Sequence, residues 1–168
     1  VTYEREAVYI AIGIKPNGHK EVIDYCIAPT ENIEIWSEML KGFKSRGLEQ
    51  VELFLSDGVV GMKEAICQSY PKAHFQRCLV HVMRNISAKM RVDDRQKALD
   101  EFKQIHTQSN KEMAVQVLHE FYQNWEKAYK NVVRDLRQVE PDLLTFYNYP
   151  PAIRASIYST NMIESFNN

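Results

Sequence analysis

The hydrophobic and polar positions of the first 28 residues indicate two β-strands joined by a turn. Residues 6–14 (EAVYIAIGI) are rich in β-branched and aromatic side chains, and residues 19–28 (HKEVIDYCIA) show a similar pattern. Between them, residues 15–18 (KPNG) combine proline, asparagine and glycine, which are typical of turns. The pattern therefore predicts an antiparallel hairpin.

The stretch that follows, up to residue 80, alternates helix and strand signals. From position 32 apolar residues recur at helical spacing, and this pattern stops at Gly47. Residues 51–55 (VELFL) predict a short strand, and a helix follows over 59–70. Residues 75–80 fit either a further strand or the lead-in to a helix. This order predicts the α/β class, with a mixed sheet covered by helices.

The second half of the chain changes character, because residues 83–146 contain no convincing strand pattern. Ser109 and Glu112 form a capping-box pattern, which opens a long amphipathic helix. That helix carries apolar residues at helical spacing: Ala114, Leu118, Phe121, Trp125, Ala128, Val132 and Leu136. Pro141 ends it and begins a shorter helix through Tyr147. We interpret this block as an all-helical insertion.

The two ends of the chain suggest that it is part of something longer. It begins with Val1 rather than methionine, and it ends within what reads as an unfinished helix over 160–168. Residues 149–151 (YPP), which precede that helix, read as a linker. The 168 residues fit one domain. We therefore interpret the sequence as a piece excised from a longer protein.

Composition narrows the function classes. Hydrophobic residues make up 45% and charged residues 26%, which is ordinary for a soluble globular protein. No apolar run is long enough to cross a membrane, and no signal peptide opens the chain. The three cysteines stand at unrelated spacings, which argues against a disulfide framework and favours the cytoplasm. A net charge of −1 argues against a large DNA-binding surface, but it allows a catalytic core that other regions hold on DNA.

Two acidic residues are candidate metal ligands. Asp57 directly follows the strand VELFL, and ligands gather at the carboxyl ends of strands in open α/β sheets. A carboxylate there suits Mg²⁺, which needs only one or two protein oxygens. The alternative is that Asp57 caps the next helix. Glu164 has a similar alternative, because with Asn161 as N-cap it falls where a capping-box acid bonds back to the cap.

Cys78 and His81 are spaced so that both could hold one metal ion from the same helix. A closed zinc site needs four ligands, however, and no second cysteine or histidine pair stands at a matching spacing. His106 and His119 lie singly on predicted helices. We therefore expect no structural zinc, a packed Cys78, and His81 facing a cleft.

A set of basic residues falls at roughly helical steps after position 76. Its members are Arg77, His81, Arg84, Arg91 and Arg95. If one helix carries them all, they form a basic face, which is either a solvated surface or a surface that contacts phosphates. We expect Asp93 and Asp94 to interrupt that helix, which would separate Arg95 from the other basic residues.

Four segments together carry a specific resemblance. They are 55–58 (LSDG), 61–63 (GMK), 75–85 (FQRCLVHVMRN) and 159–167 (STNMIESFN). In this order they resemble the bacterial insertion-sequence transposases of the Mutator-like family. The likeness runs over essentially the whole chain, including the helical block with its Trp125.

The resemblance implies an RNase H-like core in which three acids, Asp, Asp and Glu, hold two divalent metal ions, Mg²⁺ or Mn²⁺, with no organic cofactor. Asp57 matches the second acid and Glu164 the third, while Cys78 and His81 match the family's C-x-x-H signature. The first acid lies on the first strand of the sheet, which we expect to precede Val1. With that strand truncated, we expect the fragment to have an exposed sheet edge and little or no catalysis alone.

By the same resemblance, residues 1–82 form the first part of the core, 83–150 the helical insertion, and 151–168 the last core helix with the final acid. The implied activity is metal-dependent cleavage and strand transfer of double-stranded DNA, both transposon ends and target, by a homo-oligomer in the bacterial cytoplasm, at the nucleoid when bound to DNA. Arg84 and Asn161 would orient the site or contact phosphate. The alternatives are an RNase H-like nuclease and a non-catalytic self-association module.

Overall fold

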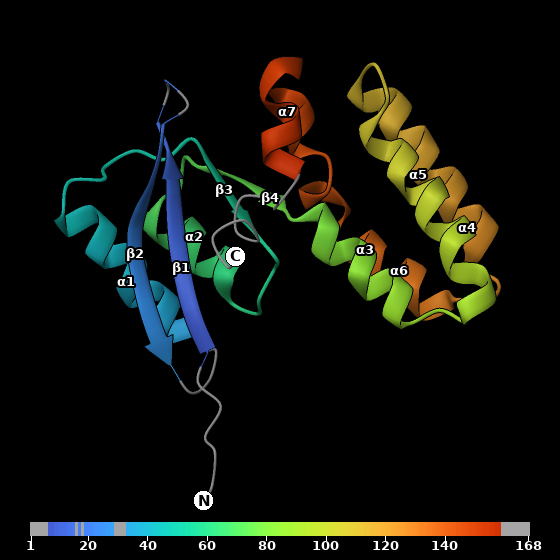
Figure 1. Cartoon of the computed structure of the whole chain (residues 1–168), viewed down its shortest axis with the longest axis horizontal. Helices are drawn as coiled ribbons and strands as arrows, with labels where there is room; N and C mark the ends of the chain where they lie inside the picture. The colour runs from blue at the N-terminus through green and yellow to red at the C-terminus, as the bar shows by residue number, and fades with distance from the viewer. Residues whose placement is uncertain (1–6, 16, 18, 29–32, 159–168) are drawn as a thin grey trace, which may run out of the picture. The chain divides into compact units, whose positions relative to one another are not determined.

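The computed structural model describes residues 7–15, 17, 19–28 and 33–158. The chain divides into two compact units. Unit 1 comprises residues 1–54 and 58–73, and unit 2 comprises residues 55–57 and 74–168. Figure 1 shows a β-hairpin in unit 1 and a largely helical unit 2.

The hairpin of unit 1 confirms the first prediction. Strand β1 (Ala7–Ile14) pairs antiparallel with β2 (Lys20–Ala28), and Ile10 lies opposite Tyr25. The register shifts at Ala11 and Ile12, whose partners are Asp24 and Val22, so β2 carries one extra residue there. Such a bulge bends the strand and increases its local twist.

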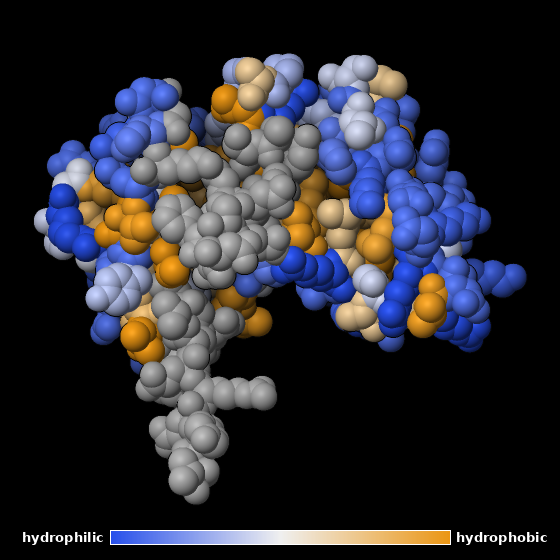
Figure 2. All heavy atoms as spheres, viewed as in Figure 1, coloured by the Kyte–Doolittle hydropathy of each residue, from blue (hydrophilic) through white to orange (hydrophobic). Residues whose placement is uncertain are grey.

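The two faces of this hairpin differ in what covers them. On one face the Asp24 carboxylate accepts a hydrogen bond at 2.9 Å from Arg46, which directly follows helix α1 (Ile33–Ser45). Large apolar side chains are exposed elsewhere on the hairpin: Ile10, Ile14, Val22, Tyr25 and Ile27. Figure 2 shows apolar side chains at the surface in this region. Among the described residues, β1 and β2 have only each other as sheet partners.

Helix α1 packs against α2 (Met62–Ser69), and their facing apolar residues form the core of unit 1. These residues are Met39, Leu40, Phe43, Met62, Ala65 and Ile66. Helix α1 stops where the sequence predicts, because Gly47 adopts a positive φ of 98° that favours glycine. The Tyr70 hydroxyl then donates to the Leu48 carbonyl at 2.7 Å and fixes the chain after that turn.

A second two-stranded sheet pairs β3 (Leu53–Ser56) with β4 (His74–Arg77). The strand predicted over 51–55 therefore exists, shifted toward the carboxyl end. Both alternatives for 75–80 hold in part, because β4 ends at Arg77 and helix α3 (Leu79–Ala88) begins two residues later.

The rest of unit 2 is helical, as predicted for 83–146. Its longer helices are α3, α4 (Val92–Lys103), α5 (Lys111–Trp125), α6 (Lys130–Val139) and α7 (Pro151–Tyr158). Short 3₁₀ turns connect them: η1 (Gln104–His106), η2 (Glu140–Asp142) and η3 (Thr145–Asn148). Fully buried side chains fill the interior: Phe102, Ile105, Leu118, Phe121, Tyr122, Val133, Leu143 and Phe146.

The long helix expected after Ser109 is wrong in two respects. Its cap is Asn110, whose side chain accepts a hydrogen bond from the Met113 amide at 2.9 Å, so the Ser109 capping box does not form. The helix also breaks between Trp125 and Lys130. The Trp125 indole donates to Glu101 of α4 at 2.8 Å, and the Tyr129 hydroxyl donates to Asp94 of the same helix. These tertiary bonds outweigh the local preference for one continuous helix.

The expected basic face and linker also need correction. Helix α3 ends at Ala88 and α4 begins at Val92. The helix is therefore interrupted before Asp93, and the basic residues do not share one helix. Asp93 and Asp94 stand in the first turn of α4, where acidic side chains complement the helix dipole. The predicted linker at 149–151 is shorter than expected, because Pro151 begins α7.

The structure establishes the mixed α/β class that the sequence predicts. The final helix predicted over 160–168 lies outside the described residues. None of the helices in the described ranges is both long enough and apolar enough to span a bilayer.

Candidate functional site

Asp57 directly follows the last residue of β3, as the sequence predicts. Its side chain is exposed, and its Oδ1 lies 3.5 Å from the Ser56 hydroxyl. The alternative role as a helix cap is wrong: the N-cap of α2 is Gly61, at φ 82°, and no side chain caps this helix end. The Asp57 carboxylate is therefore not engaged in capping.

The carboxyl ends of β3 and β4 lie side by side in unit 2. The Cys78 amide, just after β4, donates to the Ser56 carbonyl at 2.7 Å. This bond brings the backbone at Asp57 next to the start of α3. A carboxylate at adjacent strand ends, beside the first turn of a helix, is the usual position of a ligand site in α/β proteins.

Cys78 and His81 form a hydrogen-bonded pair at this end of the strands. The Cys78 sulfur is buried and lies 3.2 Å from Nδ1 of His81, which is half-buried in the first turn of α3. The expectation that Cys78 packs in the interior is confirmed. Because the thiol occupies Nδ1, the other ring nitrogen, Nε2, is the one that remains to meet a further partner.

Arg84 lies on α3 three residues after His81 and is exposed. The opposite side of the same helix is buried through Leu79, Val82 and Ile86. Arg84 therefore presents a cation to solvent one turn further along the helix that begins beside Asp57.

The donor atoms present indicate which metal would suit the site. Within the described ranges, no three histidine, cysteine or acidic residues cluster closely enough to hold an ion. The exposed Asp57 carboxylate is a hard oxygen donor of the kind that Mg²⁺ and Mn²⁺ prefer. The Cys78 thiol and the His81 imidazole are softer donors that bind each other. Asp57 therefore fits a magnesium-like ion, whereas Cys78 and His81 fit a positioning role.

Two further candidates, Asn161 and Glu164, lie outside the described residues. Their relation to Asp57 stays a prediction.

Sequence reasoning missed the role of Gln76, the second residue of the motif FQRC. Its side chain is fully buried and links β4 to the end of the helical block. Its Nε2 donates to the carbonyls of Arg77 and Leu143 at 2.8 and 2.9 Å, and its Oε1 accepts from the Phe146 amide at 2.9 Å. Thr145 adds a bond to the Phe75 carbonyl at 2.8 Å. These bonds fix the strand that leads into Cys78.

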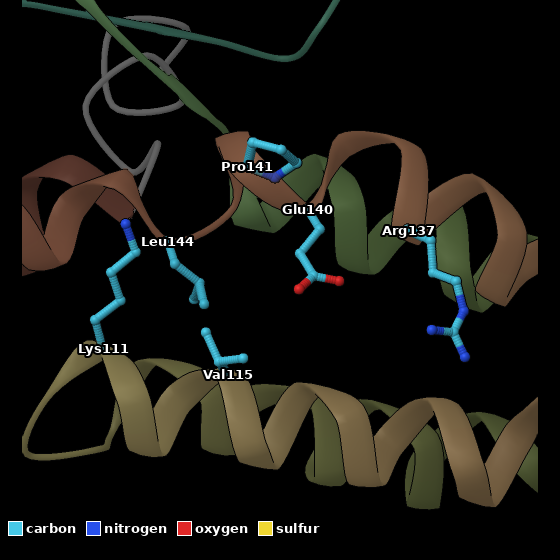
Figure 3. Close-up of a pocket in the computed structure, with 6 residues that line it drawn as sticks. All are labelled: Lys111, Val115, Arg137, Glu140, Pro141 and Leu144. Carbon is cyan, nitrogen blue, oxygen red and sulfur yellow. The ribbon is translucent and has the colours of Figure 1, made fainter.

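A second polar cluster joins α5 to η2. The Glu140 carboxylate lies 2.9 Å from His119 and accepts from the Tyr122 hydroxyl at 3.0 Å. The Arg137 guanidinium lies over the Tyr122 ring at 4.6 Å. Burial, together with Glu140, raises the pKa of Tyr122 well above its usual value. Figure 3 shows Glu140 and Arg137 pointing toward α5, so these charges are satisfied within the helical block.

Comparison with known proteins gives one consistent result. Residues 2–168 match the family described as "Transposase, Mutator family". The chain is 75% identical to the transposase for insertion sequence element IS1201 of Lactobacillus helveticus, over 99% of this chain and 45% of that protein. It is 45% identical to the transposase for insertion sequence element IS905 of Lactococcus lactis, over 99% of this chain and 42% of that protein. The chain thus spans less than half the length of these relatives.

Proposed function

Since the chain belongs to the Mutator family of transposases, we propose that it forms part of the catalytic core of an enzyme that cleaves DNA and joins it to a target. The observation that carries this proposal is the exposed Asp57 carboxylate at the adjacent carboxyl ends of β3 and β4. The named relatives, all transposases for insertion sequence elements, support the reaction class.

We propose an RNase H-like fold for the complete core. The order of a hairpin, a helix, a strand, a helix and a strand supports it. The pairing of β3 with β4 also supports it, because these two strands are joined through a helix and their carboxyl ends lie side by side. In this proposal the first strand, with the first acid, pairs with β1 and comes from outside these 168 residues.

Asp57 and Glu164 are the proposed metal ligands, for Mg²⁺ or Mn²⁺. Two such ions would neutralise charge on the scissile phosphate and bind the attacking and leaving oxygens. Asp57 contributes a fixed negative charge at the strand ends, where the backbone bond between Cys78 and Ser56 holds its position. No side-chain nucleophile is needed, since water and then a DNA 3′-hydroxyl are the attacking groups.

The remaining motif residues act on position and charge. Cys78 holds Nδ1 of His81, which orients the imidazole and directs Nε2 away from the buried thiol. Arg84 supplies a cation that can contact a phosphate next to the scissile one, and Asn161 has the same proposed task. The partners are double-stranded DNA and further copies of the protein, in the cytoplasm.

The test is metal-dependent cleavage of a duplex that carries the element's end, with the intact protein. Asp57→Asn keeps the side chain's size and removes its charge, so we expect cleavage to fall by at least about a thousandfold while DNA binding persists. Glu64→Gln, at an exposed acid of α2, is the matched control and keeps wild-type cleavage. Full cleavage by Asp57→Asn would show that Asp57 is not a catalytic metal ligand. The alternative of a non-catalytic self-association module predicts no metal-dependent cleavage even by the wild-type protein.

A further inference from the structure

A cationic depression lies between the end of α3 and the start of α6, on the helical block of unit 2. It has a volume of about 650 Å³. The residues whose charges matter there are Lys89, Lys130, Arg134 and Asp135. All three cations are exposed, and Lys89 and Arg134 have side-chain exposures of 53% and 61%. The proposed catalytic site does not include this surface.

The charges in this depression do not balance. One carboxylate, Asp135, accepts from Lys89 at 2.9 Å and from Arg134 at 3.0 Å. Lys130 makes no ion pair with any residue in the described part of the chain. Three cations therefore share one anion, although the whole chain has a formal net charge of −1. The two bonds also lower the pKa of Asp135, so it stays ionised at neutral pH.

The start of α6 adds to this positive potential. Its N-cap is Tyr129, which provides no side-chain cap for the first amide groups of the helix. Lys130 and Arg134 stand four residues apart, so they project from the same side about 6 Å apart along the axis. The buried residues of α6, Val132, Val133 and Leu136, hold this exposed face in place against the core.

We propose that this surface, formed by Lys89, Lys130 and Arg134, binds the phosphate backbone of duplex DNA and helps to hold the transposon end on the catalytic core. This rests on the proposed function, which makes duplex DNA the polyanion that the protein meets. Duplex DNA carries one negative charge for about every 1.7 Å of its axis, so neighbouring phosphates can meet cations about 6 Å apart. Contacts of this kind position DNA without reading its sequence.

Arg137 is not part of this surface, although it lies on the same helix one turn beyond Arg134. Its guanidinium lies over the Tyr122 ring and pairs with Glu126 at 3.4 Å. Arg137 therefore serves the junction between α5 and α6.

The experiment measures metal-free binding of the intact protein to a labelled duplex by fluorescence anisotropy, over a series of salt concentrations. For Lys130→Gln combined with Arg134→Gln we expect about tenfold weaker binding near 0.1 M salt. The slope of log affinity against log salt should fall by roughly 2, equally for specific and unrelated duplexes. Asp135→Asn changes charge in the opposite direction, so it should tighten binding and raise the slope.

Lys103→Gln is the matched control, since Lys103 is an exposed cation on α4 with side-chain exposure of 49% and an acidic partner, Asp100, at 3.8 Å. This control should leave the DNA affinity and the salt slope unchanged. The double variant, Asp135→Asn and Lys103→Gln should all unfold at the same temperature as the wild-type protein. Unchanged DNA affinity in the double variant would overturn the proposal. So would a double variant that binds vesicles of anionic lipid more weakly than the wild type does but binds DNA equally well.

The outcome is independent of the catalytic claim. If Asp57→Asn still cleaves DNA, the proposed catalytic role of Asp57 fails whatever the affinity of the double variant. If the double variant binds DNA normally while Asp57→Asn is inactive, the α6 surface is not a DNA contact and the proposed active site stands.

Discussion

Gln76 provides the sharpest structural prediction, because one buried amide satisfies three backbone groups of unit 2. Replacing it by leucine puts a slightly larger apolar side chain in this position and removes every one of these bonds. The Leu143 carbonyl and the Phe146 amide are then buried without this partner, at a cost of about 1–3 kcal/mol each. Apolar contacts of the leucine offset part of this cost, so we expect a net loss of about 2–4 kcal/mol.

The assay is amide hydrogen exchange of the segment 143–147, read by mass spectrometry. A loss of about 2–4 kcal/mol corresponds to exchange that is roughly 30-fold to 700-fold faster. Gln96→Leu is the control, because Gln96 is exposed and, among the described residues, its side chain bonds only to Asp100 on its own helix, at 2.9 Å. If exchange in Gln76→Leu stays within about threefold of wild type, the reasoning about this buried network is refuted.

Three further predictions concern the interior, pH and thiol reactivity. Phe121→Ala should lower the free energy of unfolding by about 3–5 kcal/mol in urea titrations, because Phe121 is 1% exposed, whereas Met113→Ala, on the same helix at 43% exposure, should cost under about 1 kcal/mol. Burial and Lys103 lower the pKa of His106, so below about pH 6.5 the unfolded state binds more protons than the folded state. The free energy of unfolding should therefore fall as the pH drops through that value, and His106→Gln should flatten this dependence. A maleimide should label exposed Cys67 quickly and buried Cys78 only after urea is added; equal rates would contradict the buried pair of Cys78 and His81.

Local sequence signals predicted those features that local interactions determine. The hairpin follows from a turn sequence between two β-like runs, and α1 ends at Ser45, two residues before Gly47, whose positive φ stops the helix. Asp57 could be singled out because the end of a strand followed by an acid is readable from neighbouring residues alone.

The features that sequence reasoning missed depend on distant contacts. Gln76 bonds to Leu143 and Phe146, which lie 67 and 70 residues away along the chain. The break between α5 and α6 contains no glycine or proline, and it reflects bonds from Trp125 and Tyr129 to α4. The cationic surface at the start of α6 likewise forms only when Lys89, which follows the last residue of α3, is brought beside Asp135.

Asn110 illustrates a third kind of difference. It competes with Ser109 for the cap of α5, and both residue types are good caps. The choice between them moves the start of the helix by one residue. Sequence alone does not separate such neighbours, because the free energies of the two caps are similar.

The most direct test of the central claim is an experimental structure of the intact protein with Mn²⁺ and a duplex carrying the transposon end. We expect oxygens of Asp57 and Glu164 at about 2.0–2.2 Å from ions that are themselves about 3.5–4 Å apart. The first acid, from the strand beside β1, should complete the ligand set. An occupied metal site to which Asp57 contributes no oxygen would contradict the account.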